Sequence, residues 1–90
     1  MNAAEARMIT AQNSEKVAEV QLKTVIETME NQIAIAARNG RSFASISIDP
    51  GQEWYVHYNN RKLAGYFENL GYEVRINSLM TNTVLSCSWI

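Results

Sequence analysis

The stretch that decides the fold is AAEARMITAQNSEKVAEVQLKTVIETMENQIAIAARN, residues 3–39, more than a third of a 90-residue chain. It contains neither proline nor glycine, the two residues that most disfavour a helix interior. Asn2 precedes it with Glu5 three positions on, which is the pattern of a helix N-cap, and Gly40 follows it as a helix stop. The sequence therefore predicts one long helix over 3–39. A break at Asn13-Ser14 stays open, because both side chains compete for backbone hydrogen bonds.

Apolar residues recur along the second part of this helix at steps of three and four, the period of one helix face. The main stripe consists of Leu22, Val25, Ile26, Met29, Ile33, Ala36 and Ala37. A sparser set, Val17, Val20 and Ile35, points away from that stripe and hints at a second contact surface. We therefore expect the main stripe to pack on the rest of the domain.

The remainder of the chain, 42–90, reads as short strands and one short helix. Residues 43–48 and 72–77 alternate between apolar and polar, as half-buried strands do, and 83–90 places Leu85, Cys87 and Trp89 on one face. The segment 52–58 after the Pro50-Gly51 turn is expected to be a short strand or an irregular loop. Asn59 or Asn60 is expected to cap a helix that Gly71 ends, with Leu63, Tyr66, Phe67 and Leu70 on one face, and 78–82 to be the loop of a hairpin.

This order of elements predicts a single α+β domain over residues 1–90. The long N-terminal helix should pack on a small, mostly antiparallel sheet of three to four strands, with one short second helix. A helix over 3–39 would be roughly 55 Å long at ~1.5 Å per residue, whereas a compact domain of this size is nearer ~30 Å across. We expect residues 3–20 to extend past the sheet and to pack against a second copy, which makes a homo-oligomer, most simply a dimer. The alternative is that the main apolar stripe of the helix only covers the sheet and that no second copy is involved.

Composition excludes several classes of partner. Eight basic and nine acidic residues give a net charge of −1, which argues against binding duplex nucleic acid. No apolar run reaches the ~18–20 residues that span a bilayer, and the N-terminus lacks the pattern of a signal peptide. The single cysteine, Cys87, fits a reducing compartment. We expect a cytoplasmic protein that neither enters a membrane nor requires a cofactor.

The most chemically loaded stretch is WYVHYNNRK, residues 54–62, which we call the aromatic–basic segment. Its aromatic rings can stack on a base, its cations can hold a phosphate, and its amides can meet base edges. The candidate ligand-binding residues are Tyr55, His57, Tyr58, Asn60, Arg61 and Lys62, joined by Arg38 and Arg41 if the fold brings these two near. The alternative interpretation places Trp54 and Val56 in the core and leaves the remaining side chains as ordinary surface.

Residues suited to catalysis or metal binding are sparse. His57 and Cys87 are the sole histidine and the sole cysteine, thirty positions apart. Cys87 shares a strand face with Leu85 and Trp89, which indicates a small core residue. One His and one Cys make a poor zinc site, and no acidic pair has spacing that suggests acid–base chemistry. We expect neither a metal site nor an enzyme, with a small enzyme using His57 as an open alternative.

Three pieces of the sequence together resemble small proteins encoded by bacteriophages and prophages. They are the helix end Ala37-Arg38-Asn39-Gly40, the run Leu70-Gly71-Tyr72-Glu73-Val74 and the terminal strand Ser86-Cys87-Ser88-Trp89. These pieces are structural and carry no functional residue. The resemblance implies an accessory protein made in a bacterial cytoplasm. Such a protein would bind and inhibit a host protein, or would sequester a small anionic ligand such as a nucleotide immune signal. A structural or assembly component of a phage particle is the alternative.

Overall fold

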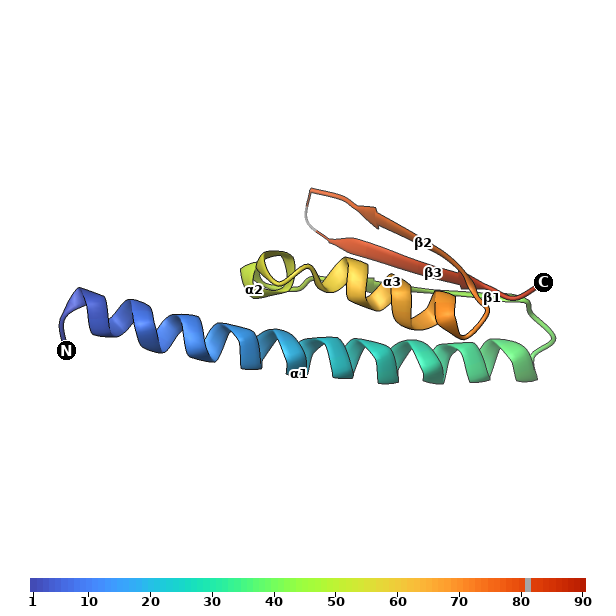
Figure 1. Ribbon diagram of the computed structural model, residues 1–90. Coiled ribbons are helices and arrows are strands. Elements are labelled where there is room, and N and C mark those ends of the chain that lie inside the picture. The colour runs from blue at the N-terminus through green and yellow to red at the C-terminus, as the bar shows by residue number, and fades with distance from the viewer. Residues whose placement is uncertain (81) are drawn as a thin grey trace.

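The computed structural model describes residues 1–80 and 82–90, and its longest element is helix α1, Ala3–Arg38 (Figure 1). The Asn2 side chain accepts a hydrogen bond from the Glu5 backbone N–H at 2.9 Å, which confirms the predicted N-cap. The helix runs without a break through Asn13 and Ser14, so the question left open by the sequence is settled. It ends one residue earlier than predicted, and Gly40 follows with a φ of 76°.

The three strands form one antiparallel sheet in the order β1-β3-β2. Strand β1 is Phe43–Ile48, β2 is Glu73–Ser78 and β3 is Thr83–Ser88. The central strand β3 pairs with both neighbours, so that Cys87 lies opposite Ala44 on one side and Val74 on the other. The predicted hairpin between the last two strands is confirmed. Its predicted loop, 78–82, includes residue 81, which lies outside the described residues.

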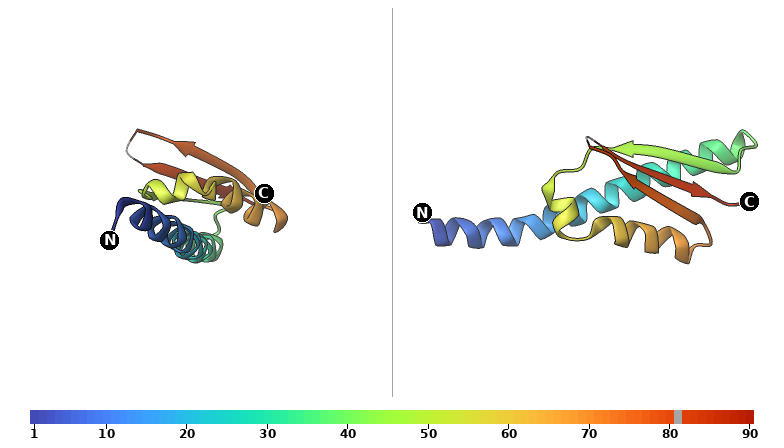
Figure 2. Two further views of the ribbon diagram at one scale, coloured as in Figure 1. Left: turned by 60° about the vertical axis from the view of Figure 1, so that its left-hand side comes forward. Right: turned by 90° about the horizontal axis from the view of Figure 1, so that it is seen from above.

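Helices α1 and α3, Asn59–Asn69, cover the same face of the sheet, α1 beneath β1 and α3 beneath β2 (Figures 1 and 2). Inward-pointing side chains alternate along each strand, as expected for a sheet with one covered face. The core between the layers consists of Met29, Ile33, Ala36, Ala44, Trp54, Leu63, Phe67, Leu85 and Cys87. This arrangement confirms the predicted α+β architecture.

The opposite face of the sheet carries no helix. Its side chains are mostly polar, and Ser45 and Ser86 on neighbouring strands share a hydrogen bond of 2.8 Å between their hydroxyl oxygens. Glu73 and Arg75 on β2 form an exposed ion pair at 3.6 Å. Phe43, 59% exposed, is the one large apolar side chain of β1 on this face. The open face is therefore suited to solvent.

The prediction for residues 52–58 is wrong, because the chain forms a short helix, α2, Gln52–Val56, in place of a strand or loop. The aromatic and β-branched content suggested β structure, but a single turn of helix is what brings Trp54 into the core with no exposed surface. The domain therefore has two short helices where one was expected. Val56 is 55% exposed, so the alternative that placed it in the core is also wrong.

The first half of α1 projects beyond the rest of the molecule (Figure 2). Residues 3–17 are exposed except for the half-buried Ser14, and Ala18 is the first buried residue of the helix. The molecule measures 56 × 25 × 18 Å with a radius of gyration of 15.5 Å, whereas a compact chain of this length has a radius of about 12 Å. The expectation that the sheet does not reach this half is confirmed. Ala37, expected in the buried stripe, is exposed.

Candidate functional site

The aromatic–basic segment forms the corner where α2 ends and α3 begins. The turn between the helices is made by Tyr58, whose φ of 57° and ψ of 39° place it in the left-handed region. The prediction that Asn59 or Asn60 caps α3 is wrong, because Tyr58 occupies the cap position and makes no side-chain capping bond. The two amides are used for contacts across the corner.

The inner side chains of the corner hold it together and fasten it to α1. The Trp54 indole N–H donates to Asn60 Oδ1 at 2.7 Å. The Asn59 amide donates to the Ala18 carbonyl at 2.9 Å, and both residues are 1% exposed. Asn60 Oδ1 accepts from the Trp54 indole and the Asn60 amide lies 3.4 Å from Ser78 Oγ, so Asn60 is less available to a ligand than the sequence suggested. The buried Asn59 Oδ1, by contrast, has no hydrogen-bond partner among the described residues.

His57 and Tyr55 are also engaged within the fold. His57 Nε2 lies 2.9 Å from Ser14 Oγ, which joins the corner to the first half of α1. The Tyr55 hydroxyl lies 2.7 Å from Thr83 Oγ1, which joins it to the sheet. A serine hydroxyl beside an imidazole is the arrangement that nucleophilic catalysis uses, but such a base is normally oriented by a third group. None of the hydrogen bonds of the described residues supplies a carboxylate to His57.

The outer side chains of the corner are free to meet a ligand. Tyr58 is 71% exposed, and Arg61 and Lys62 are exposed on the first turn of α3. Neither cation forms an ion pair with another described residue. An aromatic ring and two cations thus stand together at one corner, where they can contact a planar, negatively charged group.

Arg38 and Arg41 lie at the other end of the molecule. The corner is fastened to α1 at Ala18, and Arg38 lies twenty residues further along the same helix. At ~1.5 Å per residue that separation is about 30 Å. The structure therefore does not bring the two arginines to the aromatic–basic segment, and they cannot contact the same small ligand.

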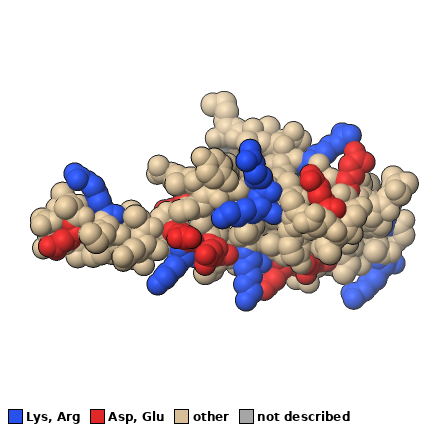
Figure 3. All heavy atoms as spheres, viewed as in Figure 1, with Lys and Arg blue, Asp and Glu red and all other residues tan. Residues whose placement is uncertain are grey.

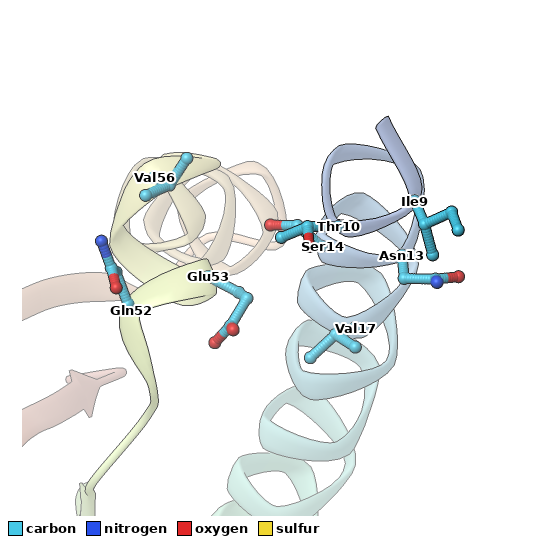
Figure 4. A pocket seen from close by; sticks show the side chains of 8 residues that line it. All are labelled: Ile9, Thr10, Asn13, Ser14, Val17, Gln52, Glu53 and Val56. Carbon is cyan, nitrogen blue, oxygen red and sulfur yellow. The ribbon is translucent and has the colours of Figure 1, made fainter. Parts of the chain in front are cut away.

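An open pocket of about 410 Å³ lies between the first half of α1 and α2 (Figure 4). Glu53 from α2 and Thr10, Ser14 and Val17 from α1 point into the space between the two helices, while Val56 lies on the outer side of α2. The sequence analysis did not identify this pocket. Ser14 did carry a signal, since it precedes the buried Ala18 by one helical turn and so lies on the core side of α1.

Charge and metal-ligating groups give no further site. On the face seen in Figure 3, basic and acidic side chains are interspersed with no patch of one sign. No group of three or more His, Cys, Asp or Glu side chains in 1–80 and 82–90 is placed to hold a metal ion. Among the helices of the described chain, none has both the length and the apolar character needed to cross a membrane. The corner and the adjacent pocket together form the candidate ligand site.

Comparisons with known proteins found no match, whether to a family model, to a curated protein or to a solved structure. No function is transferred from a relative, and the function is argued from the geometry of this chain.

Proposed function

We propose that the protein is a non-enzymatic binding protein of bacteriophage or prophage origin. It acts in the bacterial cytoplasm as a homo-oligomer, and its corner takes a small anionic ligand such as a nucleotide. A host protein with an acidic surface is the alternative target of the same corner. The observation that carries the proposal is Tyr58, an exposed aromatic residue in a left-handed conformation beside Arg61 and Lys62.

The conformation of Tyr58 is costly and its exposure gives little in return. For a residue other than glycine, the left-handed region costs roughly 1–2 kcal/mol. A tyrosine that is 71% exposed recovers little of this by burial, and the Tyr58 hydroxyl makes no hydrogen bond to another described residue. Strained residues cluster at functional sites, where the strain helps to orient a side chain. Here the strained backbone holds an aromatic face outward at the start of α3.

The neighbours of Tyr58 define the chemistry of its ligand. Stacking of a base on an aromatic side chain is worth about 1–3 kcal/mol, and it tolerates different bases. An arginine can hold a phosphate through two parallel hydrogen bonds, and a lysine can add a point charge. Arg61 and Lys62 follow Tyr58 by three and four residues and are both exposed. This combination fits a nucleotide better than it fits an uncharged or cationic ligand.

The remaining residues of the corner support a binding role over a catalytic one. His57 and Ser14 connect α2 to α1, and in this proposal their hydrogen bond is structural. The proposed phage origin rests on the sequence pattern alone. The projecting half of α1 supports self-association, because helices in water are normally covered on at least one face.

Isothermal titration calorimetry with a panel of mono-, di- and cyclic nucleotides tests the ligand. Tyr58→Gly is the informative variant, because glycine adopts the left-handed conformation without strain. We expect this variant to stay folded, with a free energy of unfolding equal to or up to about 1 kcal/mol above wild type, and to bind at least tenfold more weakly. Arg61→Ala should also weaken binding, whereas the matched control Arg75→Ala on β2 should not.

Two outcomes would contradict the proposal. If no nucleotide of the panel gives heat with the wild-type protein, the small-ligand proposal is wrong and the host-protein target takes its place. If a nucleotide binds but Tyr58→Gly and Arg61→Ala bind it as tightly as wild type, the ligand is right and the corner is the wrong site.

A further inference from the structure

Helix α1 carries a continuous uncharged stripe on the flank that faces away from α3, which we call the outer stripe. Its members recur at steps of one, three and four residues over nearly the whole helix. They are Ala6, Ile9, Thr10, Asn13, Val17, Val20, Thr24, Thr28, Asn31 and Ile35. Val17, Val20 and Ile35 are 43%, 66% and 48% exposed. A stripe with this period on a helix marks a packing face, and all ten of its members are exposed in the described structure.

The threonines make the outer stripe more apolar than its composition suggests. Thr24 Oγ1 donates to the Val20 carbonyl and Thr28 Oγ1 to the Thr24 carbonyl, each at 2.9 Å. Because these hydroxyls are satisfied by the helix backbone, little polar surface has to be desolvated when the flank is covered. The central part of the stripe therefore behaves as apolar surface.

The rest of the fold leaves this flank open. Helix α3 lies on the opposite side of α1, where the Tyr66 hydroxyl donates to Glu30 at 2.7 Å. Two open pockets border the outer stripe, one against α2 of about 410 Å³ and one against the β1–α2 turn of about 360 Å³. A long partner laid along the outer stripe would close the exposed side of both pockets.

Over residues 16–27, charged residues line one edge of the outer stripe in alternating sign, and the next charge on that edge, Glu30, accepts a hydrogen bond from Tyr66 of α3. In chain order the charged residues of 16–27 are Lys16, Glu19, Lys23 and Glu27, all exposed. When this order is reversed, as in an antiparallel copy, a lysine stands near each level where the original has a glutamate. Lys16 then lies within two residues of the level of Glu27 of the second copy, about 3 Å along the axis at ~1.5 Å per residue, and Glu19 lies within one residue of the level of Lys23. This self-complementarity identifies the partner chemically, since opposite charges at such edge positions set the partner and the orientation of paired helices.

We propose that two copies of the chain pair through the outer stripes of their α1 helices, antiparallel and about a two-fold axis near Val20 and Gln21, the midpoint of α1. The inference rests on the proposed homo-oligomer and specifies its interface. In this arrangement Ala6 of one copy lies level with Ile35 of the other, and Val17 lies level with Thr24. The projecting half of each helix covers the open flank of the other helix, so that both copies are completed by one contact.

The size of this contact reaches the minimum expected of a specific interface. A 36-residue helix is about 54 Å long at ~1.5 Å per residue, and packed helices lie ~8–10 Å apart. The footprint is then on the order of 500 Å² on each copy, or about 1,000 Å² in total, which reaches the lower limit for a specific interface. Contacts of the projecting half with α2 and with the β1–α2 turn of the other copy would add to it.

The oligomeric state of the full chain tests the inference. Light scattering after size exclusion should give twice the 10.2 kDa of one chain. Val17→Glu or Val20→Glu should raise the dissociation constant at least a hundredfold and give the single-chain mass, because each places a charge in the outer stripe. Ala11→Glu is the matched control, an exposed position on the same helix opposite the stripe, and should leave the dimer intact. Thermal unfolding of each variant checks that the fold is kept.

The orientation is tested by charge reversal and by cross-linking. Lys16→Glu should weaken the dimer, and the double variant Lys16→Glu with Glu27→Lys should restore it. Val20→Cys should form an intermolecular disulfide on oxidation, because position 20 lies beside the two-fold axis. Ala6→Cys should cross-link only together with Ile35→Cys. The native Cys87 does not interfere, since it is buried.

The outcomes separate this inference from the proposed function. A wild-type protein that is monomeric at all concentrations overturns both the α1 pairing and the homo-oligomer, while calorimetry judges the nucleotide site independently. An oligomer that survives Val17→Glu and Val20→Glu overturns the α1 pairing alone. A dimer in which Ala6→Cys cross-links to itself overturns the antiparallel orientation.

Discussion

The two halves of α1 show how differently one regular helix can be used. Residues 22–38 place Met29, Ile33 and Ala36 in the core beneath the sheet. Residues 3–17 belong to the same unbroken helix, yet only Ser14 among them is even half-buried. Helix formation does not require the first half to be covered, because extending an existing helix adds a hydrogen bond per residue without a new nucleation step. Covering an apolar stripe, by contrast, requires a partner.

The boundary between the halves is set by two contacts from the corner. Asn59 reaches the carbonyl of Ala18, and His57 reaches Ser14 one turn earlier. On the core side of these contacts the sheet and α3 cover one face of α1. Beyond them the described residues of α1 are exposed except for the half-buried Ser14. The following predictions test this division, beginning with the largest expected effect.

The same substitution should have a large effect on stability in the second half of α1 and almost none in the first. Met29 has no exposed surface, so Met29→Ala should lower the free energy of unfolding by about 2–5 kcal/mol. Met8 is 64% exposed, and Met8→Ala should change the free energy of unfolding by less than about 0.5 kcal/mol. Urea denaturation of both variants measures the difference. Equal losses would show that the first half is packed as tightly as the second.

The boundary itself should be sensitive to Asn59. Asn59→Ala removes the hydrogen bond to the Ala18 carbonyl, which remains an acceptor within the α1 helix, and also removes the buried Asn59 Oδ1, which has no partner among the described residues. We expect a loss of about 0.5–1.5 kcal/mol in the free energy of unfolding. Asn69→Ala, at an exposed position at the other end of α3, is the control and should be nearly neutral. If the two variants are equally stable, the corner does not fasten α1 at this point.

A smaller effect should appear in the pH dependence of the covered region. Burial raises the pKa of the Cys87 thiol from 9.0 to about 11, so the folded protein keeps a proton that the unfolded chain releases. This contribution to stability is fully present below pH 9 and is lost as the pH rises from 9 towards 11. Unfolding midpoints across this range should fall more steeply for wild type than for Cys87→Ala. Parallel profiles would show that the thiol is not protected by the core.

Local patterns in the sequence predicted those elements that local physics decides. The N-cap at Asn2 is a motif of four neighbouring residues, and it was confirmed. The apolar stripe from Leu22 to Ala36 and the alternation along β1 and β2 are patterns that repeat over several residues, and they were confirmed as well. The five-residue helix α2 was missed because one buried side chain, Trp54, outweighs the β propensity of its neighbours. A single tertiary contact of this kind leaves no periodic signal.

The candidate site was predictable only where its residues are neighbours in sequence. The exposed residues Tyr58, Arg61 and Lys62 lie close together in sequence, at the start of α3, and their residue types were enough to identify them as candidates. The left-handed backbone of Tyr58 was not predictable, because tertiary contacts of the next two residues close the turn. Asn59 bonds to the carbonyl of Ala18, 41 positions away, and Asn60 bonds to the buried Trp54. The contact between Ser14 and His57 was not predictable either, because it joins positions 43 apart in sequence. The distance of Arg38 and Arg41 from the corner follows from the length of α1.

The strand order β1-β3-β2 also dictates how the chain can assemble. Both outer strands pair with β3, which follows them in sequence, so neither has its native partner until β3 has been synthesised. The β2–β3 hairpin closes a short loop and can form early, whereas joining Ile48 to Thr83 closes a long one. Until that step the backbone of β1, FASISI, lacks its native strand partner. An emerging chain therefore exposes, next to its longest helix, a strand that other chains can pair with.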